Sequence, residues 1–168
     1  MELLSLHPLP IPQRKMILYI KPKQNNRSWR ILNEDDLLQK TRRLLDSRNK
    51  NETLVQFDHV DFESLDDMLL FFSNVAAVLG HGGALFNHRW TGQDTLVMEF
   101  VRKTSVTHEF WEEASILGQN YWAFPLDTSG LRNMTVIVDN VVDVLNRHLG
   151  GPRNGPSLEH YYPWDIEG

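Results

Sequence analysis

Residues 76–90 of the chain read AAVLGHGGALFNHRW, and this stretch decides the predicted fold. Its first five residues are a short, wholly apolar run, as expected of a strand that is buried on both faces of a sheet. Gly82 and Gly83 then lead into an amphipathic run that we expect to be helical. A buried strand that passes through a glycine turn into a helix is one half of a βαβ unit, which favours an α/β fold.

The same alternation of strands and helices continues on both sides of this turn. The apolar patterns predict strands at 16–22, 53–58, 95–101 and 120–127, helices at 33–48, 64–75 and 108–119, and a strand that runs into a last helix within 134–151. Asn33 and Ser64 are the expected N-caps of the first two helices. Strands that alternate with helices in this way predict a Rossmann-like parallel sheet with helices on both faces.

The domain organisation follows from composition. Residues 15–150 are expected to form one Rossmann-like domain, preceded by a proline-rich extended leader (1–14) and followed by a turn-rich surface tail (151–168). Hydrophobic residues make up 41% of the chain and charged residues 23%, as in ordinary soluble domains. The net charge of −5 argues against a nucleic-acid partner, and no apolar run approaches the length of a membrane span. The chain has no cysteine and therefore neither disulfides nor thiolate metal sites.

The glycine turn is the candidate binding site. In doubly wound sheets, ligands bind beyond the carboxyl ends of the strands, near the reversal in strand order. Gly82 and Gly83 allow a phosphate to approach the backbone amides at a helix start, and His81 adds a side-chain donor there. The alternative is a turn that is required only for packing, with His81 in solvent.

Charged residues near the expected strand ends extend this site. Glu99 lies in the next apolar strand, where a carboxylate either accepts from ribose hydroxyls or forms a structural ion pair. A basic cluster follows the first strand and either holds a diphosphate or forms an ordinary solvated loop. Its members are Lys21, Lys23, Arg27 and Arg30.

The segment HGGALFNHRW, followed by TLVMEF and preceded by FESLDDMLLFFSNVAAVLG, closely resembles the C-terminal half of family 61 glycosyltransferases, the fungal members above all. The similarity extends over residues 16–149 and includes YIKPKQNNRSWRILNEDDLL near the start. The resemblance implies one half of a GT-B fold, in which two Rossmann-like domains face each other and the C-terminal one holds a nucleotide-sugar donor. It also implies residence in the endoplasmic reticulum or Golgi, although we recognise no targeting signal in these 168 residues.

Carried over position by position, the resemblance implies donor-binding roles for seven residues. They are His81, Gly82, Gly83, Asn87 and Glu99, with Arg30 near the diphosphate and Lys21 where the family has arginine. The implied reaction is inverting and uses a UDP-sugar, a protein or glycan hydroxyl as acceptor, and neither a metal nor another cofactor. The acceptor half and its catalytic base are expected to lie outside this sequence, so the chain by itself is expected to be an inactive fragment.

Two other functions remain open at this point. GHGGAL partly matches the Gly-x-Gly-x-x-Gly pattern, which would indicate a fragment of a dinucleotide-dependent oxidoreductase. However, Leu85 stands where the third glycine would be, and the turn follows the third expected strand rather than the first. The second alternative is a degenerate transferase domain that acts as a non-catalytic interaction module.

Overall fold

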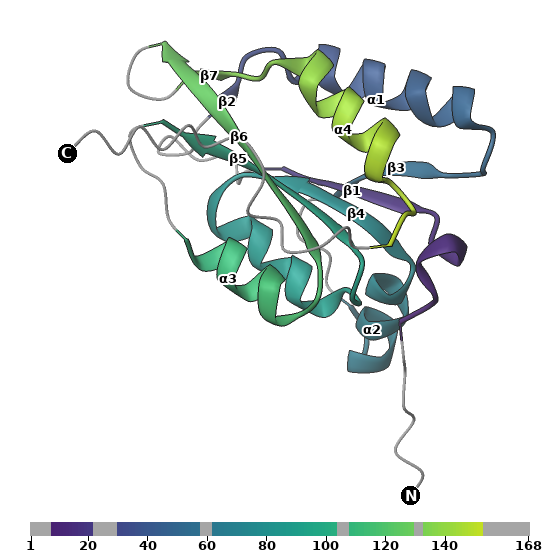
Figure 1. Ribbon diagram of the computed structural model, residues 1–168. Helices are drawn as coiled ribbons and strands as arrows, with labels where there is room; N and C mark the ends of the chain where they lie inside the picture. Colours follow the sequence, from purple (N-terminus) through teal and green to yellow (C-terminus); the bar gives the residue numbers. More distant parts are fainter. Residues whose placement is uncertain (1–7, 22–29, 58–61, 104–107, 130–132, 153–168) are drawn as a thin grey trace, which may run out of the picture.

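The computed structural model describes residues 8–21, 30–57, 62–103, 108–129 and 133–152. These residues form one mixed sheet with strand order β2-β7-β6-β5-β4-β1-β3 (Figure 1). The strands are β1 (Met16–Ile20), β2 (Arg30–Ile31), β3 (Thr53–Phe57), β4 (Val75–Gly80), β5 (Leu96–Arg102), β6 (Asn120–Ser129) and β7 (Asn133–Thr135). The helices are α1 (Glu34–Arg48), α2 (Leu65–Ser73), α3 (Glu109–Ile116) and α4 (Val138–His148), and two 3₁₀ helices are η1 (Ile11–Gln13) and η2 (Gly82–Trp90).

Five neighbouring strands, β3-β1-β4-β5-β6, are parallel, which confirms the predicted Rossmann-like α/β fold. The chain lays down β3 on one side of β1 and then crosses to build β4, β5 and β6 on the other side, so the reversal in strand order lies between β1 and β4. Beyond β6 the sheet is not as predicted. β7 runs antiparallel to β6, and β2, which we expected to be part of a polar loop, pairs with β7.

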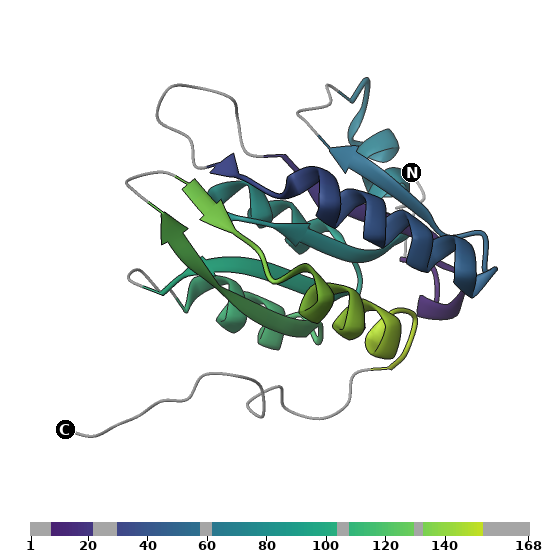
Figure 2. The same ribbon diagram turned by 90° about the horizontal axis from the view of Figure 1, so that it is seen from above.

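Helices cover both faces of the sheet (Figure 1). Seen from above, α1 and α4 lie side by side over one face (Figure 2), while α2, η2 and α3 cover the other. Side chains of β5 alternate between the two layers: Met98 and Phe100 pack with α1 and α4, and Val97 and Val101 pack with the opposite layer. Glu99 is two residues from Val97 on the same strand, so its side chain points to the same face of the sheet, which is covered by α3.

The predicted helix starts are confirmed, but their side chains differ in role. Ser64 accepts a hydrogen bond from the backbone of Asp67, as an N-cap does. Asn33 precedes α1 but makes no capping bond. Instead its side chain donates to the Val136 carbonyl (2.7 Å) and accepts from the Val136 amide (3.0 Å), so it ties the start of α1 to the end of β7.

The structure corrects the expectation of an extended leader where it describes that segment, residues 8–14. Ile11 is buried within η1, and the buried guanidinium of Arg14 donates to the Leu9 carbonyl and to Thr95. This segment therefore packs against the domain. The expected surface tail lies outside the described residues from residue 153 onward. None of the helices in the described ranges is long and apolar enough to cross a membrane.

Candidate functional site

An open pocket of about 350 Å³ lies at the carboxyl ends of β4 and β5, one strand away from the reversal in strand order. Four of the seven predicted site residues line it: His81, Gly82, Gly83 and Glu99. Strand register brings them together, because Gly80 pairs with Glu99 across β4 and β5, and this places the glycine turn beside the carboxyl group. The pocket is completed by Phe86, Phe100, Val101, Arg102, Glu109 and Phe110.

Gly82 requires the conformation that only glycine adopts easily. Its φ is +62°, in the left-handed region, and a Cβ built there would meet no atom within 4 Å. His81 and Gly82 thus turn the chain sharply at the end of β4, and the turn leaves open space in front of the backbone.

The segment after the turn is helical, as predicted, but it is a 3₁₀ helix rather than an α-helix. Its three residues per turn put Gly83 and Phe86 on the face that lines the pocket, and Leu85 and His88 on the buried face. Asn87 falls on the third face and is not among the described residues that line the pocket. The resemblance implied a donor-binding role for Asn87, and the structure does not place it in the described lining of this pocket.

The two predicted basic residues also lie outside the pocket. Arg30 is on β2, and β7 and β6 separate that strand from β5. Lys21 follows β1, where its backbone amide donates to the Phe57 carbonyl, and its side chain is not part of the described lining. Lys23 and Arg27 lie outside the described residues. The structure therefore does not place Arg30 or Lys21 in the described lining of the pocket, and their roles in donor binding stay predictions.

His81 presents an acceptor to the pocket. Its Nδ1–H donates to the Phe100 carbonyl at 2.7 Å, which leaves Nε2 with the lone pair when the imidazole is neutral. Burial lowers the pKa of His81, the bond to Phe100 opposes that shift, and the positive charge of Arg102 adds to it. At neutral pH the imidazole is uncharged, so it can accept a hydrogen bond from a ligand hydroxyl.

Glu99 is only 4% exposed and lies at the wall of the pocket. Tyr121, on the neighbouring strand β6, donates its hydroxyl to Glu99 Oε2. Burial raises the pKa of Glu99 to about 7, against the lowering influence of Tyr121 and with a smaller raising influence of Glu109. A carboxyl group in this state can donate or accept a hydrogen bond near neutral pH, which suits a hydroxyl-rich ligand.

Sequence reasoning missed three functional candidates that line this pocket, Arg102, Glu109 and Phe110, and a fourth, Tyr121, that donates a hydrogen bond to Glu99. Arg102 is the last residue of β5, and the rule that ligands bind at strand carboxyl ends could have identified it. Tyr121 could not be found in this way, because only the β5–β6 register brings its hydroxyl to Glu99. The described residues contain no group of three or more histidine, aspartate or glutamate side chains that could hold a metal ion.

A buried histidine supports the wall of the pocket from behind. His88 contacts the ring of Phe110 edge-on, and Phe110 packs against Phe86, with ring centroids 5.9 Å and 4.8 Å apart. Gln119 donates its amide to the His88 carbonyl and accepts from His88 Nδ1 at 2.8 Å, which fixes the tautomer. Nε2 of neutral His88 then carries a lone pair 3.3 Å from Glu113 Oε2, and neither atom has another hydrogen-bond partner.

Replacing Glu113 with glutamine should therefore raise the free energy of unfolding at pH 8 by about 1 kcal/mol, because the new amide N–H can donate to His88 Nε2. Burial lowers the pKa of His88, although Gln119 and Glu113 raise it, so the imidazole is neutral at pH 8. Urea unfolding measures the change, with the exposed Glu112→Gln on the same helix as the matched control. Glutamine also loses the charge that pairs with Arg89 at 2.6 Å, a partly exposed contact that should contribute less than the new hydrogen bond. Destabilisation of the Glu113 variant alone would mean that the charged contacts of Glu113, with Arg89 or with a protonated His88, contribute more than the new hydrogen bond.

No protein-family model matches the chain, and no curated protein is significantly similar to it. The functional argument therefore depends on the pocket itself.

Proposed function

We propose that this chain is the donor-binding domain of an inverting, metal-independent glycosyltransferase, and that the pocket between β4 and β5 holds a nucleotide sugar such as a UDP-sugar. The observation that carries the proposal is the convergence of His81, Gly82, Gly83 and Glu99 on one pocket at the carboxyl ends of parallel strands. This is the region where Rossmann-like sheets bind nucleotides.

The chemistry of the lining favours a ligand with hydroxyl groups. His81 Nε2 and the carboxyl groups of Glu99 and Glu109 are acceptors, and ribose and sugar hydroxyls are donors. Phe86 and Phe110 add apolar rings on which a planar base or a sugar ring can pack. In the complete enzyme, a protein or glycan hydroxyl would attack the anomeric carbon of the donor, and the nucleoside diphosphate would leave. The acceptor and its base would be bound by a second domain, and the location would be the secretory pathway.

Calorimetric titration with UDP, a UDP-sugar and NAD tests the proposal. UDP and the UDP-sugar should bind, and NAD should not. Binding of NAD alone would favour the oxidoreductase alternative. The absence of binding by all three at millimolar concentration would leave the non-catalytic interaction module.

A blocking variant links binding to this pocket. Gly83 is exposed and its φ is not in the left-handed region, and a Cβ there makes only ordinary contacts, 4.0 Å from the Phe86 ring. Gly83→Leu should therefore fold normally and weaken UDP binding at least about tenfold by filling the pocket mouth. Gly151→Leu is the matched control, because its Cβ would also make an ordinary contact, 3.5 Å from the His148 carbonyl, outside the pocket. Equal UDP affinity in the two variants would rule out this pocket as the donor site.

A further inference from the structure

Arg102 is the one cationic side chain among the described residues that line the pocket. It ends β5, next to the turn that begins with His81, and its charge acts on the His81 imidazole. The side chain is half-buried, so its charge is screened less by solvent than that of a surface arginine. The basic residues expected to bind the diphosphate lie on β2 and after β1, outside the lining.

We infer that Arg102 binds the diphosphate of the nucleotide, the role that the family resemblance implied for Arg30. This inference rests on the proposed function and adds to it the residue that neutralises the phosphates. The planar guanidinium can bind two phosphate oxygens with parallel hydrogen bonds, as lysine cannot. The open space in front of Gly82 lies in the same pocket, so a phosphate there can reach both the arginine and the backbone of the turn.

Glu109 opposes this charge within the same pocket. It lies in the first turn of α3, lines the pocket and is exposed. A bound diphosphate is repelled by this carboxylate and attracted by Arg102, so the two residues should change the affinity for UDP in opposite directions. Opposite signs at two residues of one pocket are difficult to explain by general destabilisation.

The test is calorimetric titration of UDP and UMP into the wild type and four variants that are first shown to be folded by circular dichroism. Arg102→Gln should weaken UDP binding about tenfold or more, and Glu109→Gln should strengthen it about threefold. Lys103→Gln makes the same charge change at the next, exposed residue and should alter UDP affinity less than about twofold. Arg102→Lys keeps the charge but loses the paired geometry, and it should give an intermediate loss.

The affinity for UMP, which has one phosphate fewer than UDP, distinguishes the loss of a phosphate contact from a general loss of nucleotide binding. The preference of the wild type for UDP over UMP should fall by about tenfold in Arg102→Gln, because the contact with the second phosphate is lost. If the wild type binds UDP and the Arg102 and Lys103 variants bind it equally well, Arg102 is not the phosphate ligand, and the proposed function still stands. If the wild type does not bind UDP, both fail. If Arg102→Gln does not fold, the other two variants test the inference. Weaker UDP binding by Arg102→Lys together with stronger binding by Glu109→Gln would support it, and wild-type affinity in both would overturn it.

Discussion

Replacing Glu99 with glutamine should raise the free energy of unfolding by about 3 kcal/mol at pH 8 and by less than about 0.5 kcal/mol at pH 4. In the folded protein, burial raises the pKa of this carboxyl group from its ordinary value of 4.5 to about 7. Between these two pH values the unfolded chain loses the proton and the folded chain keeps it. The contribution of Glu99 to the stability of the wild type is therefore fully present below pH 4.5 and is lost as the pH rises through 7. Glutamine stays neutral and can still accept the Tyr121 hydroxyl, so the variant avoids this loss.

Urea unfolding at half-unit steps between pH 4 and pH 8.5 measures the effect. Glu112→Gln, at an exposed position of α3, should follow the wild-type curve. Tyr121→Phe should deepen the loss at high pH, because the Tyr121 hydroxyl stabilises the ionised carboxyl and lowers its pKa. If Glu99→Gln and the wild type lose stability in parallel, the pH dependence arises from another group.

The stabilisation expected from Glu99→Gln at pH 8 bears on the function of Glu99. A carboxyl group that lowers stability at pH 8, in the wall of an open pocket, is typical of a binding residue rather than of a packing residue. A salt-bridged structural glutamate, the alternative that the sequence left open, would stabilise the protein at that pH. The observed partner of Glu99 is a tyrosine hydroxyl, which satisfies only one of the two carboxyl oxygens.

The sequence predicted the parallel part of the sheet because its signals are local. The apolar run of β4, the acidic first turn of α1 and the Ser64 cap act within a few residues, and the structure has each of these elements. β2 and β7 are two and three residues long, too short for a periodic pattern, and their pairing depends on contacts between distant segments.

The same difference between local signals and long-range contacts explains which site residues could be predicted. His81, Gly82 and Gly83 are consecutive, and Glu99 follows on the next strand in register, so chain order alone brings them together. Asn87 was assigned from the resemblance. Its position relative to the pocket depends on whether the helix has 3.0 or 3.6 residues per turn, which its composition does not reveal. Arg30 was assigned from the resemblance and from its place soon after the expected first strand. It lies instead on β2, an edge strand that β7 and β6 separate from β5 and the pocket.

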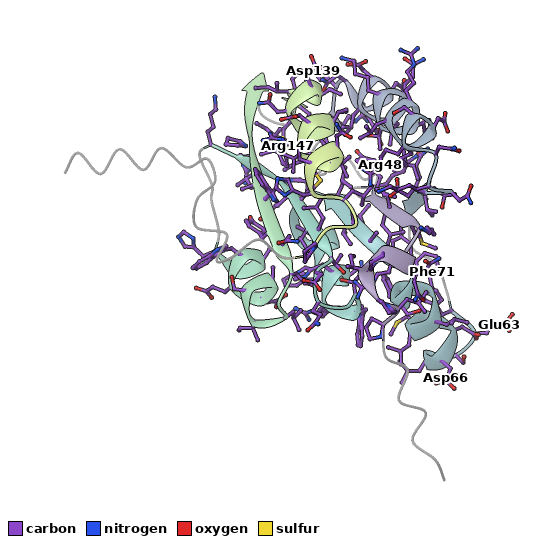
Figure 3. The ribbon with its side chains drawn as sticks, turned by 45° about the vertical axis from the view of Figure 1, so that its right-hand side comes forward. Arg48, Glu63, Asp66, Phe71, Asp139 and Arg147 are labelled. Atoms are coloured by element: carbon purple, nitrogen blue, oxygen red, sulfur yellow. The ribbon has the colours of Figure 1, made fainter. Side chains whose placement is uncertain are left out.

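The second large effect concerns the contact between α1 and α4 rather than the pocket. Replacing Arg48 with methionine should lower the free energy of unfolding by about 3–5 kcal/mol, because Glu52 is then left buried without its partner. Arg48 binds both oxygens of Glu52, at 2.6 Å and 3.0 Å, and the two side chains are 10% and 4% exposed. Its guanidinium also donates to the carbonyls of Asn146 and Leu149 at the end of α4. Figure 3 labels Arg48 near this end of α4.

Arg147→Met is the matched control for this loss. Arg147 pairs with Asp143 on the exposed face of α4, with both side chains about half exposed, and it should contribute less than about 0.5 kcal/mol. Urea unfolding at pH 7 compares the two variants. A loss of similar size in both would mean that the burial of the Arg48–Glu52 pair does not determine its contribution.

The double variant Arg48→Met/Glu52→Leu separates the two parts of the Arg48 effect. If most of the loss comes from the unpaired carboxylate, removing that carboxylate as well should recover more than about half of it. The remainder should come from the carbonyls of Asn146 and Leu149, which lose their donor in both variants. If the double variant is as unstable as Arg48→Met, the hydrogen bonds from α1 to the end of α4 make the larger contribution, and the ion pair with Glu52 serves to orient the guanidinium toward them.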